Sequence, residues 1–126
     1  MRMFLLDTEK QEAREVDIGT DLESYYKILR CDLITVTERK INGVYYDVIS
    51  DDEGLFKENQ ILSAITEEGK AALVGSILIQ RYDPENGTAA ELTQEDIENI
   101  KQRIALAEMQ SGKKIKVVVL DKGEDF

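Results

Sequence analysis

The chain has 126 residues, of which 16 are basic and 26 are acidic, giving a formal net charge of −10 at pH 7. Charged residues make up 33% and hydrophobic residues 42%, which is too apolar for a disordered chain and too charged for a membrane protein. The length predicts one domain over residues 1–126, with residues 121–126 as a frayed tail.

The acidic residues are spread along the whole chain, and this argues against direct binding of nucleic acid, which needs clustered Lys and Arg. Two interpretations of the acidity stay open. It serves solubility, or it imitates nucleic acid with carboxylates in the place of phosphates. The densest acidic stretches for the second interpretation are Asp83–Glu85 and Glu91, Glu95, Asp96 and Glu98.

A single cysteine, Cys31, excludes a disulfide within the chain, so nothing indicates an oxidising compartment. Cys31 stands beside Asp32 and away from any neighbouring cation, which favours a buried structural thiol over a reactive one. The apolar run in residues 1–6 is too short for a signal peptide or a membrane span. We therefore expect a cytoplasmic protein.

The first predicted elements are two strands and a helix. Residues 2–6 form an apolar run and residues 12–18 alternate, which together suit a hairpin. Thr20 and Glu23 have the spacing of a capping box, so a helix is predicted to start at Thr20. Its predicted core stripe comprises Leu22, Tyr25, Tyr26 and Leu29.

Two strands rich in β-branched and aromatic residues, 32–38 and 44–50, flank Asn42-Gly43 and predict a hairpin. A two-residue loop would place Glu38 opposite Asp47, and like charges facing across strands are destabilising. We therefore favour a three-residue loop, residues 41–43. That register puts Ile34, Val36, Val44, Tyr46 and Val48 on one face, and Thr35, Thr37, Arg39, Tyr45, Asp47 and Ile49 on the other, half-solvated or ligand-facing side.

After apolar Leu55 and Phe56, residues 59–69 suit a short helix. Residues 72–82 are apolar on both alternating faces and predict one interior strand, in which Gly75 allows a close contact. Pro84 and Asn86-Gly87 end that strand in a turn.

The last predicted helix begins at Thr93, with Asp96 three residues on and Leu92 packing against Ile97 as a hydrophobic staple. Its stripe of Ile97, Ile100, Ile104 and Ala107 predicts a helix running to Gly112. Residues 114–120 predict a final strand.

That strand is too apolar for an exposed edge, and Leu106 and Met109 lie on the minor face of the preceding helix. The interaction surface predicted from these features comprises Leu106, Met109, Val117 and Val119. Either the strand lies inside the sheet, or a second copy covers this surface in a homodimer, which we slightly favour.

Together these elements predict an α+β fold with one mixed, mainly antiparallel sheet of about five strands, on which two main helices pack. The predicted strands are residues 1–6, 32–38, 44–50, 72–82 and 114–120.

The sequence contains no histidine, which removes the commonest general base and zinc ligand. It also has no phosphate-loop or dinucleotide-binding pattern. The acidic turn Asp51–Gly54 could hold Mg²⁺ or Ca²⁺, but its carboxylates do not recur at alternate positions as in a calcium loop. We therefore expect no metal, no cofactor and no catalytic residue. The predicted binding residues are Arg39, Tyr45, Asp51, Asp52 and Glu53.

The run YYDVISDDEGLFKEN at residues 45–59, followed by ALVGSILI at residues 72–79, resembles the domain of unknown function family 3846, found in phages, mobile elements and gut bacteria. Glu53, Gly54, Leu55, Asn59 and Gly75 carry the resemblance over residues 20–80, whereas Asp52 stands where the family usually has Asn. The resemblance implies an accessory protein of a phage or integrated element and implies no catalytic residues.

The leading functional hypothesis is a non-enzymatic binding or protein-interaction module that contacts neither nucleic acid nor a membrane. Three alternatives stay open: an acidic mimic of nucleic acid that inhibits a DNA-binding protein, a small-ligand or nucleotide binder, and a carboxylate-dependent metal enzyme.

Overall fold

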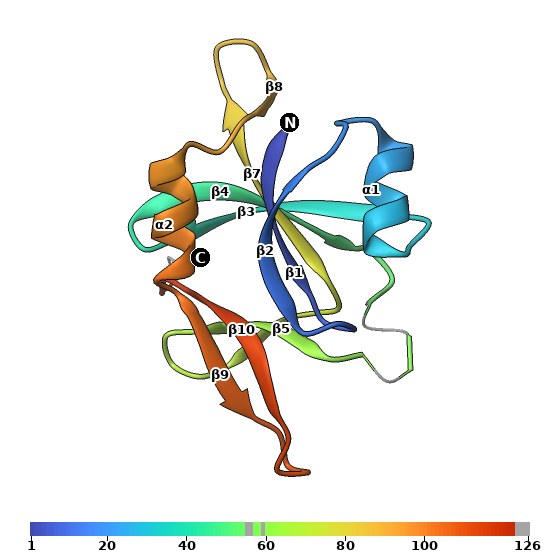
Figure 1. Ribbon diagram of the computed structural model, residues 1–126, viewed down its shortest axis with the longest axis vertical. Coiled ribbons are helices and arrows are strands. Elements are labelled where there is room, and N and C mark those ends of the chain that lie inside the picture. The colour runs from blue at the N-terminus through green and yellow to red at the C-terminus, as the bar shows by residue number, and fades with distance from the viewer. Residues whose placement is uncertain (55–56, 59, 123–126) are drawn as a thin grey trace.

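The computed structural model describes residues 1–54, 57–58 and 60–122. Figure 1 shows the arrangement of the strands and helices. The elements are β1 (Arg2–Asp7), β2 (Glu12–Asp17), α1 (Leu22–Leu29), β3 (Ile34–Ile41), β4 (Val44–Asp51), β5 (Leu62–Thr66), β6 (Ala71–Val74), β7 (Ile77–Asp83), β8 (Thr88–Ala90), α2 (Gln94–Lys101), β9 (Ile104–Glu108) and β10 (Lys114–Leu120).

The strands form two sheets, where the sequence predicted one sheet of about five strands. The first has the order β2-β1-β7-β4-β3, with β8 added to β7, and all of its pairs are antiparallel. The second has the order β6-β5-β10-β9, in which β10 and β5 are parallel. The α+β class is confirmed in its coarse form, as a mainly antiparallel β structure with two helices.

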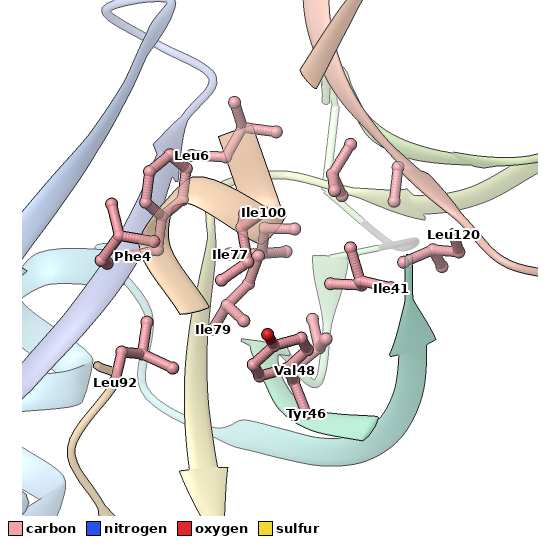
Figure 2. Packing of buried hydrophobic residues seen from close by; sticks show 13 residues of the cluster. Phe4, Leu6, Ile41, Tyr46, Val48, Ile77, Ile79, Leu92, Ile100 and Leu120 are labelled. Atoms are coloured by element: carbon pink, nitrogen blue, oxygen red, sulfur yellow. The ribbon is translucent and has the colours of Figure 1, made fainter. Parts of the chain in front are cut away.

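The first sheet is covered on both faces. Phe4 and Leu6 point into a core cluster with Ile97 and Ile100 of α2 and Leu120 of the second sheet (Figure 2). Met3 and Leu5, which alternate with them, point into a second cluster with Tyr25 and Leu29 of α1. The two helices therefore lie on opposite sides of the first sheet (Figure 1). Burial of both faces explains the uninterrupted apolar run in β1.

The N-terminal hairpin is confirmed, since β1 pairs with β2 from Arg2 to Asp7. The cap of α1 was predicted one residue too early. Asp21 is the cap, and its carboxylate accepts the Ser24 amide N–H at 3.2 Å. A carboxylate is favoured there because the helix N-terminus carries partial positive charge. Leu22 does not join the core stripe, because it is 56% exposed.

The central hairpin is confirmed, but the predicted register is wrong. Ile41 pairs with Val44 across a two-residue loop, and Asn42 and Gly43 both have positive φ, 49° and 86°. The loop is held by the Asp121 carboxylate, which accepts both loop amides at 2.8 Å. Tight turn geometry therefore outweighs the repulsion between Glu38 and Asp47, which do face each other.

This register moves several side chains to the other face of the hairpin. Ile34 and Val36 lie on the Ile49 face instead of the Tyr46 face, and Val36 is exposed. A shift of one residue in pairing reverses every side chain of a strand.

The predicted strand 72–82 is divided into β6 and β7, which belong to different sheets. Gly75 lies at the division with φ +78°, a conformation that L side chains rarely adopt. Residues 59–69 do not form the predicted helix where they are described, because 62–66 is β5, between β6 and β10. Leu55, Phe56, Asn59 and residues 123–126 lie outside the described residues, as does most of the predicted tail.

The capping box of α2 is confirmed: the Thr93 hydroxyl accepts the Asp96 N–H at 3.1 Å, and the Asp96 carboxylate accepts the Thr93 N–H at 2.9 Å. The helix is shorter than predicted, however. It ends at Lys101, and residues 104–108 form β9. Ile104 belongs to β9 and not to the helix, because it pairs with Val118 of β10 and packs against the core cluster. No helix within the described part of the chain is long and apolar enough to cross a membrane.

Candidate functional site

The acidic turn that follows β4 is tied to its own neighbours. The Asp51 carboxylate accepts the Glu53 N–H at 2.9 Å and forms an ion pair with Lys57 at 2.5 Å. The Thr35 hydroxyl donates to the Asp52 carboxylate. The first two predicted binding residues of this turn are therefore already engaged within the chain, and Glu53 is exposed.

A cleft of about 310 Å³, here called the turn cleft, lies beside Asp51. Arg30 also lines this cleft and is held by Glu9 at 3.2 Å and by Asp7 at 3.3 Å. The Ser76 hydroxyl accepts the Thr8 N–H at 3.0 Å. The polar residues that line the turn cleft are Thr8, Glu9, Arg30, Asp51, Lys57, Glu58, Gln60 and Ser76.

Two of the residues that carry the family resemblance, Gly54 and Gly75, lie beside this cleft. Gly75 lines it, and a side chain at that position would meet the Gln60 Oε1 at 2.8 Å. Gly54 packs against Val74, the residue before Gly75. A Cβ atom added to Gly54 would lie 3.5 Å from the Val74 carbonyl oxygen. Gly54, Asp51 and Asp52 line a second, smaller cavity of about 180 Å³ between β4 and β6. Leu55 and Asn59 lie outside the described residues.

A larger groove of about 470 Å³ opens between α1 and the β1–β2 hairpin, on the other side of Arg30. We call it the basic groove. It is lined by Leu5, Asp7, Lys10, Arg14, Ile18, Gly19, Ser24, Lys27, Ile28 and Arg30.

The basic groove has the opposite charge to the protein as a whole. Four of the described residues that line it are cationic, and Asp7 is the one acidic residue among them. Arg14 pairs with Glu12 at 3.2 Å, just outside the groove. Lys10 and Lys27 form no ion pair with another described residue. Their ammonium groups are therefore the cations most available to a ligand.

Asp7 is a buried residue of the basic groove and fixes the turn that follows β1. Its carboxylate accepts the Glu9 and Lys10 amides at 3.0 and 3.1 Å and pairs with Arg30. Burial alone would raise the pKa of Asp7, but the Lys10 amide and the Arg30 guanidinium outweigh it, so the pKa lies below its ordinary value. Asp7 is thus ionised at neutral pH and fixes the position of Arg30.

The structure separates the other predicted binding residues from these cavities. Arg39 and Tyr45 lie on opposite faces of the β3–β4 hairpin, because Arg39 pairs with Tyr46 and Lys40 with Tyr45. The Arg39 Nε is buried and has no hydrogen-bond partner among the described residues. Tyr45 is exposed, with the Lys40 ammonium 5.6 Å from the centre of its ring. The prediction that both lie on one face of the hairpin is wrong, since it rested on the three-residue loop.

The predicted interaction surface is also divided. Val117 is fully buried and Val119 is half-buried, because β10 lies inside the second sheet between β5 and β9. Leu106 is 65% exposed and Met109 is partly exposed, but Leu106 belongs to the strand β9 and not to a helix. The strand 114–120 is therefore not an exposed edge, and a second copy is not needed to cover it.

Asp96 belongs to the interior and not to an acidic face. Arg81 donates to both of its oxygens at 2.8 Å, and the Tyr46 hydroxyl donates at 3.0 Å. Burial would raise the pKa of Asp96, but Arg81, the Thr93 amide and Tyr46 together lower it to about 2. Burial raises the pKa of Tyr46 to about 12. Any acidic surface near α2 consists of the remaining carboxylates, among them Glu95 and Glu98.

Two observations concern the reactivity of Cys31 and the binding of metal ions. Burial, with a contribution from Asp51, raises the pKa of the Cys31 thiol, which disfavours the reactive thiolate. In the described ranges, no group of three or more His, Cys, Asp or Glu residues is placed to hold a metal ion.

A family model described as "Domain of unknown function (DUF3846)" matches residues 1–105. The chain belongs to the DUF3846 family. The match is wider than the 20–80 range of the sequence resemblance and includes every residue that lines the basic groove and the turn cleft. No curated protein and no solved structure matches this DUF3846 chain.

The basic groove was not predicted from the sequence, because its cations come from separate segments of the chain. Lys10 and Arg14 belong to the β1–β2 hairpin, Lys27 to α1, and Arg30 to its left-handed C-cap with φ 55°. The one available signal was the spacing of Lys27 and Arg30, which places two cations about one turn apart at the end of a helix.

Proposed function

We propose that this DUF3846 chain is a non-enzymatic binding protein that takes an acidic segment of a partner protein into the basic groove. The observation that carries the proposal is the reversal of charge: a chain with a net charge of −10 gathers four cations around one groove of about 470 Å³. A volume of this size lies within the range of ordinary ligand sites.

Electrostatics supports an anionic ligand. Charges separated by more than about 8 Å are largely screened at physiological ionic strength, so a ligand in the groove responds mainly to the lining residues. Lys10 and Lys27 are free to pair with carboxylates of the ligand. The distant acidic surface instead disfavours a long polyanion such as nucleic acid, whose phosphates would extend beyond the groove.

The apolar lining supports a peptide segment. Ile18 and Ile28 are half-buried at the edge of the second core cluster and lie beside the cations. A segment that alternates Asp or Glu with apolar side chains would satisfy both kinds of surface. A small organic anion has the same chemistry and is the alternative to be distinguished by experiment.

The non-enzymatic part of the proposal rests on the absence of histidine from the sequence and on the raised pKa of Cys31. The family resemblance supports a cytoplasmic accessory role in a phage or mobile element.

The test is affinity capture from a host lysate with quantitative mass spectrometry, comparing three baits. These are the wild type, the groove variant Lys10→Glu/Lys27→Glu, and the matched variant Lys40→Glu/Lys101→Glu. Both variants change the net charge equally, but the second pair lies on β3 and at the end of α2, and neither residue lines the groove. We expect a specific protein to be captured by the wild type and the matched variant, and at least tenfold less by the groove variant.

The captured protein should also dissociate as salt is raised, since charged contacts are screened. Equal loss in both variants would show that only net charge matters and would contradict the proposal. Capture of a small anion in place of a protein, again lost only in the groove variant, would support the small-ligand alternative.

A further inference from the structure

Strand β9 lies at the edge of the second sheet, and β10 is its only partner among the described strands. In Figure 1 the β9–β10 hairpin projects away from the body of the molecule. The five residues of β9 include no Pro and no Lys, which are the usual means of blocking a sheet edge. Its outer edge is therefore a place where another strand can pair.

The hydrogen bonds to β10 show which groups of β9 point outward. The Val119 N–H donates to the Arg103 carbonyl and the Met109 N–H donates to the Lys113 carbonyl, both at 2.8 Å. In an antiparallel pair the residues alternate between bonding inward and pointing outward. Odd-numbered residues of β9 thus bond to β10, and the N–H and C=O groups of Ile104, Leu106 and Glu108 point to the open edge.

The side chains and charges near this edge favour association. Leu106 is 65% exposed, which makes it the most exposed large apolar residue among those described. From Ile104 to Leu120 the hairpin has three lysines and one glutamate, so it carries +2 while the remaining chain carries −12. Two acidic molecules repel each other least where this hairpin lies between them.

We propose that two copies of the chain pair antiparallel through β9, about a two-fold axis at Leu106. Leu106 then faces Leu106 of the second copy, and Ile104 and Glu108 face each other. Every outward N–H and C=O group of β9 finds a partner, and the two second sheets become one continuous sheet.

The second copy is the fitting occupant because the edge is complementary to itself. The outward residues 104, 106 and 108 are symmetric about Leu106, as a two-fold interface requires. A two-fold axis also brings the same face of each strand together, so the exposed leucines meet on one side of the joined sheet. This interface does not involve the basic groove and does not depend on the proposed function.

The first test is the mass in solution, measured by light scattering over a range of micromolar concentrations. We expect the wild type to approach twice the mass of one chain, and Leu106→Arg to remain at the mass of one chain. The matched control is Leu22→Arg, which changes another exposed leucine, on α1, and should leave the dimer intact. A wild type that stays monomeric, or a dimer that persists in Leu106→Arg, would overturn the proposal.

The second test establishes the register by cross-linking and does not depend on the arginine variant. In the proposed pairing the two Leu106 Cα atoms are about 5.5 Å apart, within disulfide range. Leu106→Cys should therefore form a covalent dimer under mild oxidation. In Glu108→Cys the two cysteines are four residues apart along the paired strands and should not cross-link. The native Cys31 is buried and does not compete.

Equal cross-linking of the two cysteine variants would refute the register. A monomeric wild type that binds a different protein, with binding lost in Leu106→Arg, would refute the second copy and assign the edge to a foreign strand.

Discussion

The Asp96 carboxylate connects three segments that are distant in sequence. Its partners come from β4 through Tyr46, from β7 through Arg81, and from the start of α2 through Thr93. Asn99 adds to this network by donating to the Tyr46 hydroxyl at 3.1 Å. Asp96, which completes the capping box of α2, therefore also fixes the helix to the sheet.

We predict that Asp96→Asn lowers the free energy of unfolding by about 2 kcal/mol at pH 7, because buried donors lose their charged acceptor. Since folding depresses the pKa of Asp96 from 3.8 to about 2, its contribution is complete above about pH 4 and is lost as the pH falls through 2. Urea unfolding of both proteins between pH 7 and pH 2 measures this.

The neighbouring substitution Glu95→Gln removes the same charge from an exposed position and should change stability by less than about 0.5 kcal/mol. A difference between wild type and Asp96→Asn that stays constant down to pH 2 would contradict the role given to the carboxylate.

Gly75 is the second residue on which the fold depends, because it turns the chain from one sheet to the other. We predict that Gly75→Ala destabilises the protein by about 1–2 kcal/mol, the usual penalty for a side chain at positive φ. The Gln60 amide nearby is the end of a flexible side chain and can move. The same loss is therefore expected in a Gln60→Ala background, as measured by urea unfolding.

Gly54→Ala is the control for this experiment. Its added Cβ would lie 3.5 Å from the nearest atom, an ordinary contact, so stability should be nearly unchanged. Rescue of Gly75→Ala by Gln60→Ala would show that steric contact, and not backbone conformation, limits the site.

At the level of elements, the register of the central hairpin leads to a charge prediction. Glu38 faces Asp47, whose pKa is raised by burial and further by Glu38. We predict that Glu38→Lys stabilises the protein by about 0.5 kcal/mol, because an opposite-charge pair replaces a like-charge pair. In the three-residue-loop register Glu38 would face Tyr46, and no such gain would follow.

Thermal or urea unfolding of Glu38→Lys checks this prediction. Glu53→Lys, which makes the same charge change in the exposed acidic turn, separates the local pairing from the general reduction of negative charge. An equal gain in the two variants would point to net charge alone.

Local signals predicted the elements whose ends depend on neighbouring residues. The cap at Thr93, the hairpin at Asn42-Gly43 and the N-terminal hairpin were all found, because capping and turn conformations need only a few adjacent groups. The predicted length of the loop at Asn42-Gly43 was wrong. The helix predicted through Ala107 failed because apolar residues three and four apart also suit a short strand when a partner strand lies alongside.

The division of the strand at Gly75 and most of the candidate site depend on contacts between distant segments, which a sequence pattern does not reveal. Residues 72–82 are mostly apolar, and the sequence pattern does not show that Gly75, with its positive φ, separates two strands of different sheets. Asp51 and Asp52 were predicted as binding residues and do line a cavity. The cations of the basic groove were not predicted, because only the packing of α1 against the β1–β2 hairpin brings Lys10 and Lys27 to one place.

At the level of the whole molecule, the family match ends at residue 105, but the core does not. Val118 and Leu120 of β10 lie in the same cluster as Phe4 and Ile79. We predict that a chain of residues 1–105 does not fold cooperatively, because β5 loses its parallel partner and the core loses these side chains.

Circular dichroism and NMR of residues 1–105 test this, with residues 1–122 as the folded control. A sharp thermal transition and dispersed amide signals in the shorter chain would contradict the prediction. That result would make the β9–β10 hairpin an addition to an independent core.

The parallel pairing of β5 with β10 also sets an order of events on the ribosome. All strands of the first sheet precede residue 91, so they are synthesised before α2. The second sheet cannot close until β10 emerges, 46 residues after the end of β6. At 5–20 residues per second this is a delay of roughly 2–9 seconds. During that interval β5 and β6 are exposed on the nascent chain without β10. This is the stage at which a chaperone finds an unpaired sheet edge to bind.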